Sequence, residues 1–167
     1  TAGATAATRP AIRFRPRCRV WRGQAAPRGH SASTKDPGHR SMNMLFLAMT
    51  GGAIGAGARH LVNLGMGRLL GTSFPWGTLT VNIVGSLLMG VLVELLVLRY
   101  GGSGPMRTFL GTGFLGGFTT FSAFSLDLYA LIERGEALTA LTYAAGSVVV
   151  GLAALYSGII LVRGVLA

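Results

Sequence analysis

Hydrophobic residues gather in four blocks that are separated by short links. Each block is close to the roughly 20 residues that a helix needs to cross a bilayer. The predicted helices cover residues 45–64, 76–98, 108–131 and 138–162. The links between them cover residues 65–74, 99–107 and 132–137. Because these links are short, consecutive helices should be antiparallel neighbours. We therefore expect an all-α membrane protein in which residues 42–167 form one four-helix domain.

The third block contains an interruption at its centre, the run GGFTTFSAFS at residues 116–125. Glycine pairs and threonine pairs are poor helix formers, so this helix is predicted to be broken. Inside hydrocarbon, irregular backbone persists only where protein or a water-filled cavity satisfies it, and unwound carbonyls can hold ions there. One interpretation is an ion site near the middle of the membrane. The other is that Gly116 and Gly117 only allow two helices to touch.

The composition agrees with a membrane protein and argues against a nucleic-acid partner. Half of the 167 residues are apolar, 12% are charged and the mean hydropathy is +0.54, unlike an ordinary soluble domain. Residues 1–41 hold nine of the fifteen Lys and Arg residues, whereas the rest has six Arg, three Glu and one Asp, a net charge of +2. Nucleic-acid binding needs a basic folded face with stacking aromatic residues. Cys18 is alone, which excludes a disulfide framework.

Residues 1–41 form a separate basic region rich in Ala, Gly, Arg, Pro and Ser. They show no apolar periodicity, and this composition is typical of disorder. An Arg-rich, acid-poor segment can also be an organellar leader. A third interpretation is a start incorrectly assigned upstream of Met42 or Met44. In each case we expect a disordered extension outside the four-helix domain.

Polar residues recur at every fourth position in two of the blocks, which places them along one face of each helix. The stripes consist of Thr78, Asn82 and Ser86 in the second block and of Thr139, Tyr143 and Ser147 in the fourth. Hydroxyl and carboxamide groups donate hydrogen bonds without fixed charge, which suits a dehydrated anion that must also leave. The alternative is that these groups form weak hydrogen bonds between helices that only stabilise the bundle.

Two phenylalanines follow the predicted break. Phe121 and Phe124 are three residues apart, so they share a helix face if the helix resumes there. An aromatic ring is positive at its edge and negative on its face, so ring edges could contact an anion. The ordinary alternative is core packing or contact with lipid.

The charged residues of the four blocks are few. Arg59 is the only cation within a predicted span, and we expect it to extend toward the interface or bond carbonyls at a helix end. Glu94 lies near an end of the second helix and should reach water. If the helices alternate, the arginines outside the spans divide almost evenly between the two sides. The positive-inside rule then selects no orientation, and insertion both ways is expected.

Three motifs together resemble the Fluc (CrcB) family of fluoride channels. They are GGAIGAGARH at 51–60, PWGTLTVNIVGS at 75–86 and GGFTTFSAFSLD at 116–127, and the similarity extends over about 44–165. The resemblance implies a passive fluoride-selective channel in the plasma membrane that exports F⁻ from the cytoplasm. It also implies an antiparallel, dual-topology homodimer of four-helix subunits, with two fluoride pathways and a structural Na⁺ at the dimer centre.

The resemblance assigns roles to individual residues around the break. The backbone carbonyls of Gly116 and Thr119 from both subunits would hold the central Na⁺. Phe121 and Phe124 would present ring edges to fluoride, and Asn82 would face the pathway from the second helix.

Further pathway residues implied by the resemblance lie beside the break and along the two stripes. They are Thr120 and Ser122 at the break, Thr78 on the second helix, and Tyr143 and Ser147 on the fourth. Arg59 matches an arginine of the family's first-helix motif and is expected to be structural. The chain departs from the family at Ala123, where Thr or Ser is frequent, at Asp127, where Glu is frequent, and at Gly151, where some members carry a hydroxyl.

Other classes of function make different demands on the sequence. A small proton-coupled multidrug exporter needs a carboxylate in its first helix, and residues 45–64 contain none. A membrane subunit without a transport role would be silent in any flux assay. An enzyme is not expected, because the chain has no paired carboxylates in a cleft motif, no HExxH and no nucleophile with a placed base.

Overall fold

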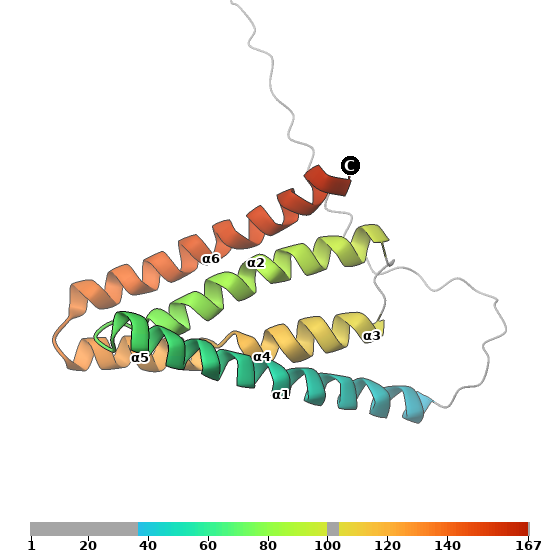
Figure 1. The fold of residues 1–167 in the computed structure, drawn as a ribbon, viewed down its shortest axis with the longest axis horizontal. Helices are drawn as coiled ribbons and strands as arrows, with labels where there is room; N and C mark the ends of the chain where they lie inside the picture. The colour runs from blue at the N-terminus through green and yellow to red at the C-terminus, as the bar shows by residue number, and fades with distance from the viewer. Residues whose placement is uncertain (1–36, 100–103, 167) are drawn as a thin grey trace, which may run out of the picture. The chain divides into compact units, whose positions relative to one another are not determined.

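The structure is a computed structural model that describes residues 37–99 and 104–166. Every regular element in these ranges is a helix, and the crossings are long and apolar enough to span a membrane (Figure 1). They are Ser41–Leu70, Trp76–Leu98, Gly104–Glu133 and Ala137–Leu166. The predicted all-α, four-crossing fold is thereby confirmed. The extension predicted for residues 1–41 lies outside the described residues up to residue 36, and the first helix begins at Pro37.

Glycine and proline set the ends of the first two helices. α1 (Pro37–Leu70) stops at Gly71, whose φ of +80° is the left-handed conformation that glycine adopts without strain. The Gly71 N–H donates to the Gly67 carbonyl at 3.1 Å, which caps the helix. α2 (Trp76–Arg99) begins directly after Pro75, where a missing N–H removes no helical hydrogen bond.

The third crossing is a series of different helices. It consists of α3 (Gly104–Met106), the π-helix η1 (Arg107–Leu115), α4 (Gly116–Phe118) and α5 (Phe121–Glu133). Between α4 and α5, Thr119 and Thr120 are extended, so the predicted break is confirmed. The glycine pair remains helical and the threonine pair forms the break. The wide turns of η1 were not predicted. They are characterised by hydrogen bonds over five residues, such as that from the Gly116 N–H to the Gly111 carbonyl.

Neighbours in space differ from neighbours in sequence. Consecutive crossings run in opposite directions, as predicted, so α2 and α6 (Ala137–Leu166) run parallel and lie side by side (Figure 1). α1 packs mainly along η1 and α4. The bundle thus contains two main helix pairs, α1 with η1 and α4, and α2 with α6, and both pairs join segments that are distant in the chain.

The contact between α1 and the third crossing is backbone against backbone. A Cβ atom at Gly117 would lie 2.5 Å from the Gly52 carbonyl oxygen, and one at Gly55 would overlap the Phe114 carbonyl. Small residues allow this close approach, which brings many atoms of the two helices into van der Waals contact. Such packing stabilises helix association in a membrane, where no hydrophobic effect drives it. The glycine motif of α1 therefore positions the N-terminal half of the third crossing.

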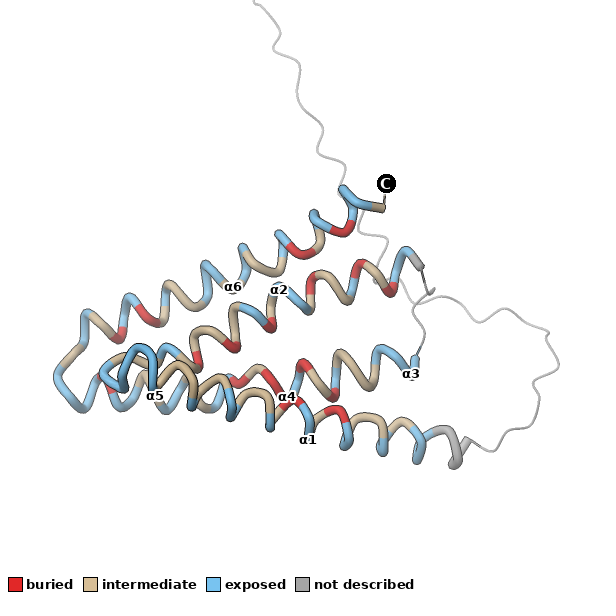
Figure 2. The backbone as a smooth tube through the Cα atoms, in the orientation of Figure 1, coloured by how far each residue is buried: buried red, intermediate tan, exposed pale blue. Residues whose placement is uncertain are grey.

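Most of the apolar surface faces outward. Figure 2 shows exposed positions along the whole described length of α1 and α6, and the buried positions lie where helices face one another. Among the described residues, the largest completely buried side chains are Val81, Leu131 and Tyr143. Tyr143, Leu131 and Ala140 form a small core at one end of the bundle, together with half-buried Phe74 and Phe124. Such an apolar exterior is suited to lipid or to another subunit.

An ion pair joins α2 to α6 near their C-terminal ends. Arg163 donates from Nε and Nη2 to the two carboxylate oxygens of Glu94, at 2.8 and 3.2 Å. The Glu94 side chain is only 9% exposed, whereas that of Arg163 is 64% exposed. The expectation that Glu94 reaches water was therefore wrong. A carboxylate buried in a span needs a partner, and the guanidinium of α6 provides a bidentate one.

Arg163→Ala should destabilise the protein, because it leaves the Glu94 carboxylate buried without its partner. We expect a lower midpoint of thermal unfolding in detergent. Adding Glu94→Gln should restore much of the loss, since a neutral amide is less unfavourable to bury. Arg68→Ala, at an exposed arginine in the last turn of α1, is the matched control. Equal midpoints for Arg163→Ala and Arg68→Ala would contradict the assigned role.

Candidate functional site at the helix break

The break consists of two helix ends that meet at two extended residues. Thr119 has φ −81° and ψ 156°, and Thr120 has φ −153° and ψ 119°. The Thr119 N–H and hydroxyl both donate to the Leu115 carbonyl, at 2.9 Å each. Thr120 caps the next helix, because its Oγ1 accepts the Ala123 N–H at 3.2 Å. Each threonine thus satisfies groups that a broken helix would otherwise leave unpaired.

Asn82 of α2 spans the break with both ends of its side-chain amide. Its Oδ1 accepts the Thr120 N–H at 2.8 Å, and its Nδ2 donates to the Thr120 carbonyl at 3.1 Å. Thr120 is buried, and an unpaired backbone group in such a place is strongly unfavourable. The sequence predicted that Asn82 faces the pathway. In the structure its amide is bonded to the backbone of the break.

These bonds release two carbonyls from their helical donors. In a continuous helix the Thr120 N–H would donate to Gly116 O, and the Ala123 N–H would donate to Thr119 O. Here those N–H groups donate to Asn82 and to the Thr120 hydroxyl. The carbonyls of Gly116 and Thr119 are the pair that the resemblance assigns to a cation. The geometry of the break therefore leaves both oxygens able to accept a further partner.

A hollow of about 290 Å³ lies beside the break, between α2, the break and α6. Its lining is Asn82, Gly85, Ser86, Met89, Thr119, Thr120, Phe121 and Leu155. It brings together three of the predicted pathway residues, Asn82, Thr120 and Phe121. Ser122 is adjacent and exposed, with its hydroxyl 3.2 Å from that of Thr120. Every polar group in the lining is uncharged.

The two phenylalanines are neighbours with different surroundings. Their ring centroids are 5.7 Å apart with the planes at 38°. Phe124 turns toward the buried Tyr143, with centroids 5.2 Å apart. Phe121 is 79% exposed. The predicted pair thus exists, with one ring anchored in the core and the other open on the surface of the subunit.

The polar stripe of α6 continues away from the break. Tyr143 is buried, and its hydroxyl donates to Asp127 Oδ2 of α5 at 3.4 Å. The Ser147 hydroxyl oxygen is buried and has no hydrogen-bond partner among the described residues. Thr78 is buried on α2. Arg59 is half-buried on α1 and does not line the hollow beside the break.

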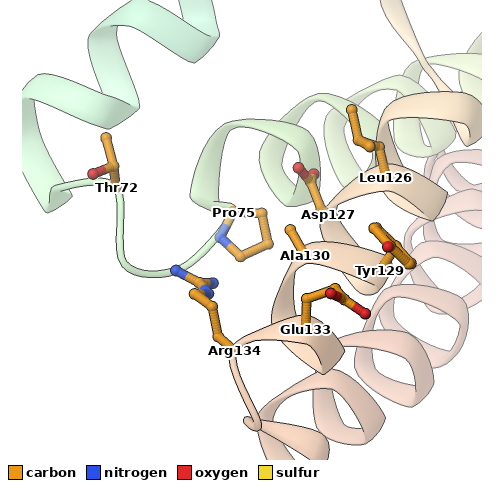
Figure 3. A pocket seen from close by; sticks show the side chains of 8 residues that line it. All are labelled: Thr72, Pro75, Leu126, Asp127, Tyr129, Ala130, Glu133 and Arg134. Atoms are coloured by element: carbon orange, nitrogen blue, oxygen red, sulfur yellow. The ribbon is translucent and has the colours of Figure 1, made fainter.

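A second hollow, of about 510 Å³, lies where the link before α2 meets the outer side of α5 (Figure 3). Pro75 lies opposite Asp127 and Ala130 in this view. Arg134 donates from Nη2 to the Ser73 carbonyl at 3.1 Å, which ties the two links together. Asp127 lines this hollow and also bonds to Tyr143, so it joins the hollow to the α6 stripe.

Two site residues were given no individual role from the sequence. Asp127 was noted only as a departure from a family pattern, and its contact with Tyr143 depends on the packing of α5 against α6. Ser86 lines the hollow beside the break. Its position one turn after Asn82 was the available signal. Groups of three or more His, Cys, Asp or Glu side chains that could hold a metal are not found in the described residues.

The fold and the site define a multi-pass membrane protein whose uncharged polar groups meet at a break inside its third crossing. The CrcB-like protein family, Camphor Resistance (CrcB), matches residues 46–159. The fluoride-specific ion channel FluC of Mesorhizobium japonicum is 53% identical over 119 residues, 71% of this chain and 95% of that protein. FluC of Chelativorans sp. is 53% identical over 125 residues, 75% of this chain and 100% of that protein. The chain belongs to the CrcB family.

Asn82→Ala should destabilise the protein, because it removes the partners of the Thr120 N–H and carbonyl. Two buried backbone groups at about 1–3 kcal/mol each predict a loss of roughly 2–6 kcal/mol. The measurement is denaturant unfolding of purified protein in detergent. Asn43→Ala makes the same change at an exposed position at the start of α1 and should have little effect. A loss no larger than that of Asn43→Ala would contradict the bridging role of Asn82.

Proposed function

We propose that this protein is a fluoride-selective ion channel that lets F⁻ leave the cytoplasm passively and so lowers cytoplasmic fluoride. Relatives that are named fluoride-specific ion channel FluC match it over 95–100% of their lengths at 53% identity. The observation that carries the proposal is the uncharged polar lining beside the break. It is a channel rather than an enzyme, and it is a multi-pass protein of the plasma membrane.

An uncharged lining suits a small anion that has to enter and leave. Hydroxyl donors replace part of the water around F⁻, while the absence of a fixed positive charge keeps the ion from being trapped. We assign this part to Thr120 and Ser122 at the break and to Thr78 and Ser147 along the stripes. Tyr143, whose O–H is donated to Asp127, would line the pathway beside them. Asn82 lines the same space, and its bonds to Thr120 hold that hydroxyl in place. Exclusion of Cl⁻ would follow from donors spaced for the smaller ion.

The exposed ring of Phe121 supports a pathway that a second subunit completes. A ring 79% exposed next to polar hydroxyls can offer its positive edge to an anion, but one subunit leaves that side open. We propose an antiparallel homodimer in which the partner covers this surface, with Phe121 and Phe124 as the ring-edge pair. The even distribution of arginines outside the spans supports dual topology.

A sodium ion fits the released carbonyls of the break. Carbonyl oxygen is a ligand that hard cations prefer, and Gly116 O and Thr119 O have lost their helical donors here. We propose that these carbonyls from two subunits hold one structural Na⁺ at the dimer centre. The positive charge of the ion would attract the carbonyl oxygens of both subunits and so hold the two breaks next to each other. Asn82 and Thr120 would act by keeping the carbonyls in this arrangement.

The membrane potential accounts for the direction of transport. At acid pH, fluoride crosses the membrane as neutral HF and dissociates in the cytoplasm. A potential that is negative inside favours outward movement of an anion by about 2.3 kcal/mol per 100 mV. A passive channel is therefore sufficient to lower cytoplasmic fluoride.

Purified protein in liposomes should release F⁻ and retain Cl⁻, as measured with ion-selective electrodes. Phe121→Ile removes the aromatic edge while keeping an apolar side chain, so F⁻ release should fall to the rate of protein-free liposomes. Phe46→Ile makes the same change at an exposed position of α1 and should conduct like the parent. Undiminished release by folded Phe121→Ile would remove this ring from the pathway.

The proposed Na⁺ should stabilise the protein. The midpoint of thermal unfolding should be higher in NaCl than in N-methylglucamine chloride, because Na⁺ at 100 times its Kd adds about 2.7 kcal/mol to the free energy of unfolding. Asn82→Ala should lose this difference, because the carbonyls are no longer held in place. Asn43→Ala should retain it. Equal midpoints of the parent in both salts would count against a bound Na⁺, although fluoride flux could still be present.

A further inference from the structure

The hydroxyl stripe of α6 ends at a glycine. Tyr143 and Ser147 are followed one turn later by Gly151, which has no side chain. A Cβ atom at Gly151 would have Ser86 Oγ of α2 as its nearest neighbour, at 3.6 Å. The Ser86 hydroxyl thus lies in van der Waals contact with the point where a side chain on residue 151 would begin. The polar lining that α6 lacks at this level is present on the facing helix.

Ser86 also belongs to the hollow beside the break. It lines that hollow with Asn82, Thr119 and Thr120. The preceding residue, Gly85, lies directly against the Thr119 side chain. One turn of α2 therefore carries both the amide that bridges the break and the hydroxyl that follows it.

The Ser86 hydroxyl is available to a ligand. Hydroxyls in transmembrane helices often donate to a carbonyl of their own helix, as Ser157 does to Ala153 at 2.8 Å and Thr142 to Leu138 at 3.0 Å. Ser86 is half-buried, and its hydroxyl forms no hydrogen bond within the part of the chain that the structure describes. A half-buried donor without a protein partner is suited to water or to an anion.

Ser86 is also the last hydroxyl of this lining. One turn further along α2, the backbone of Gly90 lies against the Leu155 carbonyl. In the same contact between α2 and α6, Gly158 of α6 lies against the Leu87 carbonyl. The two helices leave no room for a side chain between them there, and Met89 and Leu155 make the adjoining wall apolar. An ion in the hollow can therefore accept a hydrogen bond from Ser86, and the contact of α2 with α6 at Gly90 and Gly158, beyond Ser86, offers no further side-chain donor.

We propose that Ser86 is a further residue of the anion pathway, where it donates its O–H to F⁻ in place of the side chain that Gly151 lacks. This inference rests on the proposed fluoride-channel function. Loss of one hydrogen bond to an anion should slow F⁻ release by roughly tenfold. Chloride should remain excluded, because the donors at Thr120 and Ser122 keep their spacing.

The test compares F⁻ release from liposomes for Ser86→Ala and for two double variants. Ser86→Ala/Gly151→Ser returns a hydroxyl next to position 86 from the opposite helix, since the added Cβ has ordinary contact distance there. Ser86→Ala/Gly151→Ala adds the same Cβ without the hydroxyl. Ser157→Ala, at an exposed serine on the outer side of α6, is the control for loss of a helix hydroxyl. Size-exclusion elution in detergent checks folding.

We expect slow release by Ser86→Ala, recovery with Gly151→Ser, no recovery with Gly151→Ala, and parent-like release by Ser157→Ala. Equal recovery by both double variants would overturn the inference, because packing rather than a donor would then explain the defect. Absence of recovery by Gly151→Ser would also overturn it. Parent-like release by Ser86→Ala, with Phe121→Ile inactive, would overturn the role of Ser86 and leave the proposed channel intact. A parent protein without F⁻ release would instead refute the proposed function.

Discussion

The structure depends on the double hydrogen bond between Asn82 and the backbone of Thr120. A membrane interior provides no water for an interrupted helix, so a break can exist only where protein groups take over the lost bonds. One carboxamide does this for both backbone groups of Thr120, because it has a donor and an acceptor side by side. The same bonds leave the carbonyls of Gly116 and Thr119 without their helical donors. The stability of the break and the availability of these two carbonyl oxygens thus arise from a single contact.

Close backbone contact holds the N-terminal half of the third crossing against α1, and α2 against α6. Glycines of α1 bring that helix against η1 and α4, and Gly90 and Gly158 bring α2 against α6. Because lipid tails are as apolar as the helices, the tight approach itself supplies the attraction. Gly85 of α2 lies directly against the Thr119 side chain, and this contact keeps Asn82 within hydrogen-bond distance of Thr120.

Charge is kept away from the break, while donors without charge are gathered around it. Glu94 and Arg163 neutralise each other near the ends of α2 and α6, and Arg134 is bonded at the opposite end of the bundle. The lining beside the break consists of hydroxyl, amide and aromatic groups. An anion can be attracted by such dipoles and still leave, which a buried cation in the same place would hinder.

The sequence by itself determined the four crossings and the break, because apolar length and the threonine pair act locally on the helix. The polar stripes were equally readable, since spacing alone places Thr78, Asn82 and Ser86 on one face. Tertiary structure decided which groups those faces meet. The binding of Asn82 to Thr120 and the pairing of Glu94 with Arg163 depend on α2 lying beside α6 and the break. Such contacts join residues 38 and 69 positions apart, and local pattern carries no information on partners at that separation.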